Sequence, residues 1–386
     1  MGIARHLDKI LETHFETYRQ VLVLLGARQT GKTTILKRIF PNALYLLVDN
    51  EQTRVALEKY DIHSYLQIIG KGKQVIIDEL HLLSDPGRAV KIIYDQVPNI
   101  QLIATGSSAL QIKNKSSESM AGRKIEYKLF PLTFSEYLLQ IGADNQLNFT
   151  ILENIIRDQK KVTRLFSPSE LVEHVMAYGL YPEQINMPDP RNYLLDLADS
   201  AIFKDIVELN LIDNRAKAKE LLKLLAYQIG NLINYSEISN KLSIDRRTVE
   251  KYINIFEQSY IVFRLYPYSK NKRDEIGKTP KIYFHDLGLR NALIDNFDID
   301  FLRPDRGAMF ENFIISELQK IISYQQLDLK LHYWRLKSGS EVDIVLSNSR
   351  ELYGIEVKLQ NGQFSTAFTN RYPEAKTRLI TKSNFY

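Results

Sequence analysis

The chain has 386 residues, 44% of them hydrophobic and 25% charged, with a net charge of +5, which predicts two or three globular domains and excludes a disordered chain. It contains no cysteine, which excludes disulfide-stapled scaffolds, cysteine-based zinc sites, iron–sulfur clusters and thiol nucleophiles. Because its apolar stretches are strand-length and its N-terminus holds no apolar signal core, we expect a cytoplasmic protein without a membrane segment.

The sequence changes character three times. Residues 1–140 alternate between apolar strands and helical segments, as a parallel α/β sheet does. The expected strands are Val21–Leu25, Ala43–Asp49, Gln74–Leu80, Ile100–Thr105 and Ile125–Leu129. We then expect a helical connector at 141–217, a winged helix-turn-helix module at 218–300, and a second α/β domain at 301–386.

A phosphate-binding motif directly follows the first predicted strand. GARQTGKTT at 26–34 matches GxxxxGK[ST] completely and leads into a helical segment. Backbone N–H groups of such a loop cradle phosphates, Lys32 reaches the β- and γ-phosphates, and Thr33 offers its hydroxyl to Mg²⁺. A glycine turn with an incidental lysine is the alternative. The predicted nucleotide-binding residues of this loop are Gly26, Gln29, Thr30, Gly31, Lys32, Thr33 and Thr34.

Two acidic residues end the strand VIIDEL at 75–80. Downstream of a phosphate loop, Asp78 is expected to hold the magnesium through Thr33 or water, and Glu79 to orient the attacking water. A further strand, LIATGSS at 102–108, ends in Thr105, Gly106 and Ser107. A polar group there would sense loss of the γ-phosphate, although an ordinary turn has the same sequence. The predicted cofactors are therefore ATP and Mg²⁺.

A basic module lies in the middle of the chain. Residues 241–273 contain eight Lys or Arg and three Asp or Glu, so this segment carries the whole net charge. Two short helical segments, around Ile238 and around Val249, precede an extended run and the strand-like KIYFHD at 281–286. This order predicts a winged helix-turn-helix module. We expect Arg246, Arg247 and Lys251 to contact DNA, although winged helices also bind proteins.

Four polar residues of the C-terminal segment fit a second site. Glu311 lies on a predicted helix, Asp343 on a strand, and Glu356 and Lys358 on the next strand, thirteen residues after Asp343. This D…ExK set resembles the PD-(D/E)XK nucleases. The resemblance implies that Asp343 and Glu356 hold Mg²⁺, that Lys358 positions a water for attack on a phosphodiester, and that Glu311 is the helical acid. Nuclease-like domains also serve as binding modules.

Several motifs together carry a wider resemblance. GARQTGKTT, VIIDEL, ATGSSAL, AGRKIEYKLFPLTFSEYL and EVDIVL…GIEVK stand in the order that is typical of bacterial and archaeal AAA+-type ATPases with a C-terminal domain of unknown function 4143. The resemblance covers nearly the whole chain and implies a catalytic-glutamate ATPase core. It also implies that Arg123 lies near the nucleotide or near a neighbouring subunit. An arginine supplied in trans would make the protein a homo-oligomer.

The sequence thus predicts a Mg²⁺-dependent ATPase that acts on DNA, with Lys32 and Glu79 carrying hydrolysis and with Glu311, Asp343, Glu356 and Lys358 carrying any phosphodiester chemistry. The alternative is a nucleotide-dependent switch that binds DNA or a protein and has no nuclease activity.

Overall fold

The structure is a computed structural model that describes residues 2–106, 120–157, 166–201, 212–270, 279–300 and 302–386. The chain divides into two compact units, an N-terminal unit (1–131 with 258–260) and a C-terminal unit (132–257 with 261–386). The first boundary lies at 131 rather than at 140, and the three segments expected after it pack together in one unit. No helix in the described ranges is long and apolar enough to cross a membrane.

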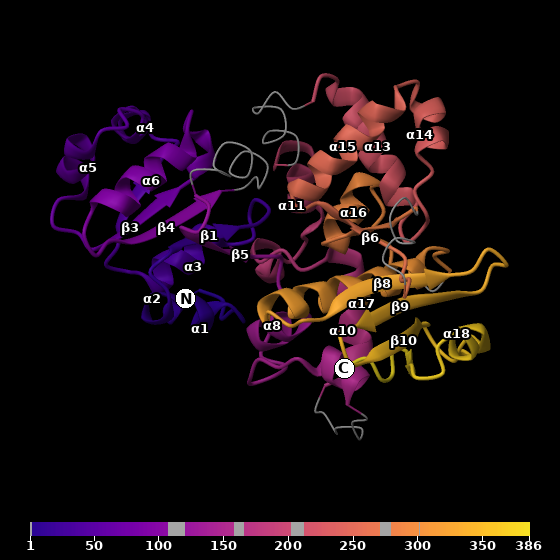
Figure 1. Cartoon of the computed structure of the whole chain (residues 1–386). Coiled ribbons are helices and arrows are strands. Elements are labelled where there is room, and N and C mark those ends of the chain that lie inside the picture. The colour runs from indigo at the N-terminus through magenta and orange to yellow at the C-terminus, as the bar shows by residue number, and fades with distance from the viewer. Residues whose placement is uncertain (1, 107–119, 158–165, 202–211, 271–278, 301) are drawn as a thin grey trace. The chain divides into compact units, whose positions relative to one another are not determined.

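A parallel sheet of five strands, in the order β2-β3-β4-β1-β5, forms the centre of the N-terminal unit (Figure 1). The strands are β1 (Val21–Leu25), β2 (Leu44–Leu47), β3 (Gln74–Asp78), β4 (Gln101–Gly106) and β5 (Lys124–Lys128). All five predicted strands are present. The apolar run of β1 is buried along its whole length, as is typical of the central strands of parallel sheets. Strand β3 stops at Asp78 because Glu79 has a left-handed φ of 57°.

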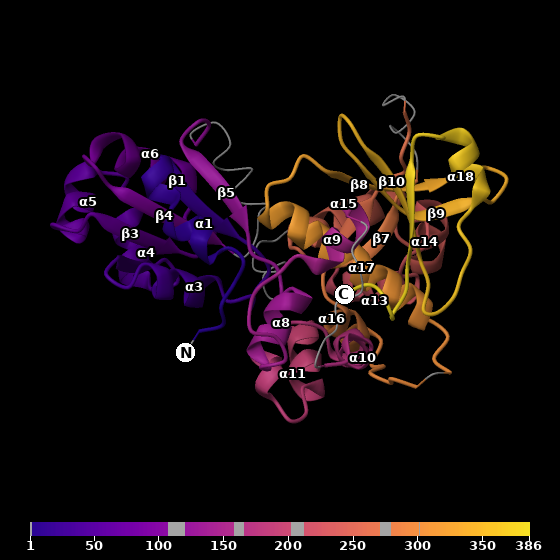
Figure 2. The same cartoon turned by 90° about the horizontal axis from the view of Figure 1, so that it is seen from below.

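Helices cover both faces of this sheet. They are α1 (Asp8–Glu12), α2 (His14–Thr17), α3 (Lys32–Ile39), α4 (Glu51–Leu57), α5 (Ile62–Ile69), the 3₁₀ turn η1 (Leu80–Leu82) and α6 (Pro86–Gln96). Figures 1 and 2 show α3 and α6 on opposite faces. The sheet order explains this placement, because right-handed crossovers from β1 to β2 and from β3 to β4 run in opposite directions along the sheet.

The helical part of the C-terminal unit contains the predicted helix-turn-helix segment. Its helices are α8 (Phe134–Gln140), α9 (Thr150–Ile156), α10 (Pro168–Tyr178), η2 (Glu183–Asn186), α11 (Arg191–Asp196), η3 (Leu197–Ala201), α13 (Arg215–Tyr227), α14 (Tyr235–Leu242), α15 (Arg246–Gln258) and α16 (Leu287–Leu293). Ser243, with a φ of 53°, makes the turn between α14 and α15. Strands β6 (Val262–Leu265) and β7 (Lys281–Phe284) then form an antiparallel pair.

A long helix and a mixed sheet complete the C-terminal unit. These elements are α17 (Arg306–Tyr324), β8 (Lys330–Arg335), β9 (Glu341–Ser347), β10 (Leu352–Val357), α18 (Thr366–Arg371) and β11 (Lys376–Ile380). The sheet order is β11-β10-β9-β8, in which β9 pairs antiparallel with both neighbours and β10 pairs parallel with β11. Trp334, Val342 and Phe368 belong to the apolar core on one side of this sheet.

The loop YGLYPEQ at 178–184 interlocks with the start of α16. A Cβ on Gly288 would lie 1.9 Å from the carbonyl oxygen of Tyr178, and a Cβ on Gly179 would lie 2.1 Å from Oδ1 of Asp286. Gly179 also has a positive φ of 73°, which L-residues rarely adopt. The Asp286 carboxylate accepts hydrogen bonds from the N–H groups of Leu180, at 2.6 Å, and Leu289, at 3.0 Å. Both glycines are therefore required by a close backbone approach.

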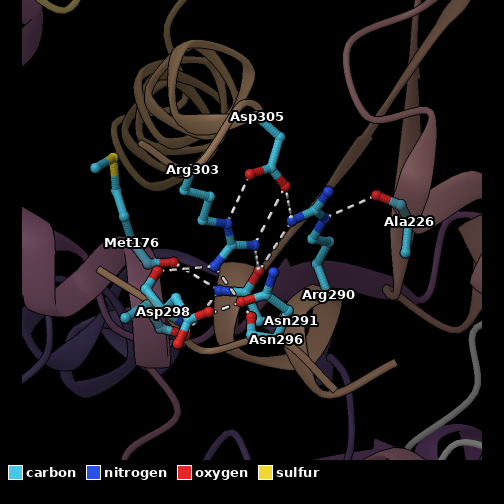
Figure 3. Close-up of polar contacts among 9 residues, drawn as sticks. Met176, Ala226, Arg290, Asn291, Asn296, Asp298, Arg303 and Asp305 are labelled. Carbon is cyan, nitrogen blue, oxygen red and sulfur yellow. Dashed lines mark hydrogen bonds and ion pairs between the residues drawn. The ribbon is translucent and has the colours of Figure 1, made fainter. Parts of the chain in front are cut away.

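A buried polar network holds the segment between α16 and α17 (Figure 3). Arg290 and Arg303, which are 0% and 6% exposed, both pair with Asp305, at 2.5 Å and 2.6 Å. Arg290 also donates to the carbonyl oxygen of Ala226 on α13, at 2.7 Å. Asn291 donates to the carbonyl oxygen of Met176 on α10. The network thus joins α10, α13, α16 and α17, and two guanidiniums share a single carboxylate.

Helix α17 also fixes the segment LTF that begins the C-terminal unit. Lys320 Nζ donates to the carbonyl oxygen of Leu132 at 2.8 Å, and the N–H of Phe134 donates to Glu317 at 2.8 Å. Lys320 and Glu317 pair with each other at 2.9 Å and are almost completely buried. Thr133 caps α8. The motif KLFPLTFSEYL therefore runs from β5 into a segment that is anchored to α17.

Candidate functional site

The loop after β1 lies against the residue that follows β5. The N–H of Leu129 donates to the carbonyl oxygen of Leu25 at 2.7 Å. A Cβ on Gly26 would lie 2.1 Å from the carbonyl oxygen of Leu129. Only glycine fits this close approach to the backbone of Leu129. From Gly26 the loop leaves the carboxyl end of β1, and it enters α3 at Lys32.

Lys32 folds back over this loop. Its side chain is buried, and Nζ donates to the carbonyl oxygens of Gly26, at 3.0 Å, and Ala27, at 2.8 Å. The buried hydroxyl of Thr30 also donates to Ala27, at 2.9 Å. The other predicted residues of the loop, Gln29 and Thr34, are exposed at the surface. An ammonium thus lies at the carboxyl edge of the sheet, where a phosphate bound at the N-terminus of α3 would meet it.

The acidic pair at the end of β3 meets the phosphate loop directly. The Thr33 hydroxyl donates to Oδ2 of Asp78 at 2.6 Å, and the N–H of Glu79 donates to Oδ1 at 3.0 Å. Asp78 is 2% exposed. Oε2 of Glu79 lies 3.2 Å from Nδ1 of the buried His81. A hydroxyl and a carboxylate are ligands that Mg²⁺ prefers, so this donor pair fits that cation.

Two residues of the N-terminal unit contact this site and could not be found from the sequence pattern. Tyr45 of β2 donates its hydroxyl to Oδ2 of Asp78 at 2.5 Å, and burial together with the nearby Asp78 raises the pKa of Tyr45. The buried Arg5 donates to the carbonyl oxygens of Thr30, at 2.9 Å, and Phe130, at 2.7 Å. Arg5 thereby ties the phosphate loop to the end of β5.

The residues expected to sense the γ-phosphate lie at the end of β4. The Thr105 hydroxyl is buried and forms no hydrogen bond within the part of the chain that the structure describes. Gly106 ends the strand, and Ser107 lies outside the described residues. Within the described residues, the Thr105 hydroxyl therefore has a hydrogen-bond donor that no protein group uses. Thr105 pairs with Leu24 of β1, the strand that leads into the phosphate loop.

Arg123 lies at the opposite end of the sheet from the phosphate loop of its own unit. It directly precedes β5, and its carbonyl oxygen accepts from the N–H of Val21, the first residue of β1. The five residues of β1, at about 3.3 Å each, separate these ends by roughly 16 Å. The Arg123 guanidinium forms two hydrogen bonds with Asp95, at 2.9 Å and 3.1 Å. Arg123 therefore lies away from the phosphate loop of its own chain, and its pair with Asp95 is one that a partly exposed surface arginine also forms.

The three residues predicted to contact DNA lie on exposed parts of α15. Arg246 pairs with Glu250 at 3.1 Å, and Lys251 pairs with Asp213 at 2.9 Å. Arg247 lies one turn before Lys251, and its N–H donates to the Asp245 carboxylate at 2.7 Å. The side chains are available to a ligand, because exposed pairs of this kind are weak. The basic sequence SKNKRD at 269–274 separates the extended run from KIYFHD, and its residues 271–274 lie outside the described residues.

Three of the C-terminal polar residues meet between β9 and β10. Ile344 pairs with Ile355, and just beyond this pair the N–H of Val357 donates to Oδ2 of Asp343 at 2.8 Å. Lys358 Nζ lies 3.0 Å from Asp343 and 2.9 Å from Glu356. Burial and the neighbouring Asp343 raise the pKa of Glu356 to about 7. Burial works to lower the pKa of Lys358, but the two carboxylates outweigh it and raise that pKa.

The fourth residue, Glu311 of α17, is held by the β6–β7 pair. Tyr283 donates its hydroxyl to Glu311 at 2.5 Å, and the buried Lys281 lies 3.3 Å from the same oxygen. Lys281 also pairs with Glu341, which lies two residues before Asp343 on β9. Burial and the charge of Asp343 raise the pKa of Glu311. The polar cluster around Glu311 therefore also contains Lys281, Tyr283 and Glu341. The sequence pattern did not indicate these three residues.

Comparison with known families assigns three segments of the chain. Residues 18–138 match the AAA domain, residues 169–300 match a domain of unknown function (DUF8612), and residues 306–384 match a domain of unknown function (DUF4143). The chain thus carries an AAA-type ATPase domain at its N-terminus and a DUF4143 domain at its C-terminus.

Relatives that match most of this chain occur in bacteria and archaea. An uncharacterized protein of Methanocaldococcus jannaschii is 26% identical over 92% of this chain and 78% of its own length. An uncharacterized protein of Haemophilus influenzae is 22% identical over 88% of this chain and 82% of its own length. Among solved structures, the Walker-type ATPase of Pyrococcus abyssi matches 74% of this chain and 94% of its own with 14% identity and a TM-score of 0.48.

Proposed function

We propose that this protein, with an AAA domain and a DUF4143 domain in one chain, is a Mg²⁺-dependent ATPase that acts on DNA. The observation that carries the proposal is the 2.6 Å hydrogen bond between the Thr33 hydroxyl and the Asp78 carboxylate. It brings the phosphate loop and the acidic end of β3 together at one edge of the sheet. In P-loop ATPases this edge is where chemistry takes place.

Each residue then has a role of its own. Thr33 and Asp78 would hold the magnesium ion, which supplies charge neutralisation on the phosphates. Lys32 would exchange its two loop carbonyls for phosphate oxygens. Glu79 would orient the attacking water and take its proton, with His81 beside it. The unused hydroxyl of Thr105 supports a role in sensing the γ-phosphate.

Arg123 enters the proposal only through an assembly. Its place at the amino end of β5 favours contact with the nucleotide of a neighbouring copy. In that assembly the Arg123 guanidinium would leave Asp95, its partner at the protein surface. Such an arginine adds positive charge to a transferring phosphoryl group. We therefore propose a homo-oligomer as the active form.

DNA contact is proposed for α15 because its exposed cations stand on the second helix of a helix-turn-helix segment. Replacing Arg246, Arg247 and Lys251 together by alanine is expected to weaken DNA binding and to reduce the slope of log affinity against log salt by about 3, since each phosphate contact contributes roughly 0.9. Fluorescence anisotropy with a labelled duplex at several salt concentrations measures both quantities.

The matched control for this variant removes the same charge from the N-terminal unit, at the exposed Lys59, Lys71 and Lys73. Equal affinity and an equal salt slope in the α15 variant and the wild type would rule out this helix as the DNA contact. DNA affinity that disappears in the wild type at physiological salt would instead favour a protein partner for α15.

For the C-terminal cluster we propose phosphodiester cleavage at Asp343, Glu356 and Lys358, with Glu311 as the supporting helical acid. The support is geometric, because one ammonium and two carboxylates meet within 3.0 Å. The rival is a nucleotide-dependent switch that binds DNA or a protein without cleaving it.

Lys358→Ala decides between these candidates. Linear and branched DNA are incubated with the protein in Mg²⁺ or Mn²⁺, with and without ATP. We expect cleavage by the wild type and a loss of about 100-fold or more in the variant, which lacks the group that stabilises developing charge. The control is Lys337→Ala, because Lys337 is exposed in the loop between β8 and β9.

Emission from Trp334, the single tryptophan, checks that the Lys358→Ala unit is folded. Cleavage that persists in a folded Lys358→Ala protein would exclude this site as its source. No cleavage by the wild type, with DNA binding retained, would establish the switch instead.

A further inference from the structure

Tyr45 approaches Asp78 because of the register between β2 and β3. Leu47 pairs with Asp78, and Tyr45 pairs with Ile76. Side chains two residues apart on a strand share a face, and so do paired residues on neighbouring strands. Tyr45 and Asp78 therefore share a face of the sheet, one diagonal step apart, and the phenol is long enough to bridge that step. Its hydroxyl donates to Oδ2 of Asp78 at 2.5 Å.

Helix α3 holds the same phenol from the other side. Thr33 and Lys37 are four residues apart and so lie on one face of the helix. The Thr33 hydroxyl donates to the oxygen of Asp78 that also accepts from Tyr45, and Lys37 Nζ lies 3.9 Å from the centroid of the Tyr45 ring. A cation over an aromatic face is attracted to it. Tyr45 thus has a fixed position between the helix and the sheet.

The donor role of Tyr45 is stable. A carboxylate oxygen accepts hydrogen bonds and has no proton to donate, so the Tyr45 hydroxyl is the donor to Asp78. The Asp78 carboxylate consequently receives hydrogen bonds from three segments: from Thr33 on α3, from Tyr45 on β2, and from the backbone of Glu79.

We propose that Tyr45 is a positioning residue for the metal–nucleotide site. It fixes the orientation of the Asp78 carboxylate and, through the shared Oδ2 atom, the orientation of the Thr33 hydroxyl. The inference rests on the proposed ATPase function and deepens it. Because Asp78 and Thr33 would hold the metal, Tyr45 affects the affinity for nucleotide bound with Mg²⁺. It does not affect the affinity for metal-free nucleotide.

Tyr45→Phe removes the hydroxyl alone and keeps the ring under Lys37. The fluorescent analogue mant-ATP is titrated into the full chain in excess Mg²⁺ and, separately, in EDTA. We expect the variant to bind mant-ATP more weakly in Mg²⁺ by about tenfold or more, which is the effect of losing one hydrogen bond to a charged group, and to equal the wild type in EDTA. Tyr60→Phe is the matched control, because its hydroxyl contacts Ser84 and the N–H of Asp85, away from the site.

The two buffers separate the outcomes. An unchanged affinity in Mg²⁺, a tighter one, or an equal loss in both buffers overturns the role of Tyr45 while the proposed ATPase function stands. A wild-type chain that binds mant-ATP in neither buffer overturns both. Weakening that is confined to Mg²⁺, and absent from Tyr60→Phe, supports Tyr45 as the positioning residue.

Discussion

Glu79→Gln is expected to lower kcat for ATP hydrolysis by about 100- to 1,000-fold while ATP still binds, because general-base groups contribute on this scale. The amide has the shape of the carboxylate but cannot accept a proton from water. The variant keeps the backbone N–H that donates to Asp78, so the metal ligands stay in place. Phosphate release in Mg²⁺ measures turnover, and mant-ATP titration measures binding.

Two companions make this experiment specific. Lys32→Ala is expected to lose turnover together with nucleotide affinity, since the ammonium acts on the phosphates themselves. Glu51→Gln, on the exposed first turn of α4, is expected to match the wild type in both assays. Hydrolysis at the wild-type rate in Glu79→Gln would assign the base to another residue.

Asp305→Ala is expected to destabilise the C-terminal unit by about 3 kcal/mol or more, which is the scale for breaking a buried ion pair. The substitution leaves Arg290 and Arg303 buried with no counter-ion, whereas Arg290→Met leaves Asp305 paired with Arg303 (Figure 3). Arg290→Met should therefore cost less, about 1–3 kcal/mol for the lost hydrogen bonds. The variant that combines Asp305→Ala with Arg290→Met should lose less free energy of unfolding than the sum of the two single losses.

Urea unfolding followed by Trp334 emission tests this prediction, because the only tryptophan of the chain is buried in the C-terminal unit. Asp295→Ala is the matched control. It removes a carboxylate from an exposed pair with Arg191, where losses are about 0–1 kcal/mol. Equal unfolding midpoints for Asp305→Ala and Asp295→Ala would show that the network contributes little to stability.

The parallel sheet could be predicted from the sequence because buried strands of such sheets are continuous apolar runs. The meeting of Thr33 and Asp78 could be predicted for a related reason. Motifs that directly follow parallel strands lie at the same edge of the sheet. Thr33 and Asp78 can therefore meet although 45 residues of sequence separate them. The same rule places Arg123, which precedes a strand, at the other edge. The resemblance to AAA+ ATPases implied that Arg123 lies near the nucleotide or near a neighbouring subunit. Its place at this edge is away from the phosphate loop of its own chain, and contact with a neighbouring subunit stays a prediction.

Residues whose role depends on register or on distant packing could not be predicted. Tyr45 stands in the apolar run ALYLLVD and looks like a core residue, and only the pairing of β2 with β3 directs its hydroxyl to Asp78. Lys281 meets Glu311 across thirty residues of sequence. The packing of three expected segments into one unit has the same cause. The contacts of Asn291 with Met176 and of Arg306 with Glu173 join segments with no shared local pattern.

The interlock between YGLYPEQ and the start of α16 restricts how this chain can change over generations. An alanine at Gly288 would overlap the backbone of Tyr178, and an alanine at Gly179 would overlap the Asp286 side chain. A second substitution elsewhere cannot relieve an overlap with backbone unless one segment moves. The two glycines are therefore expected to persist together among descendants of this chain, because the loss of either one would require a movement of the segment that it faces.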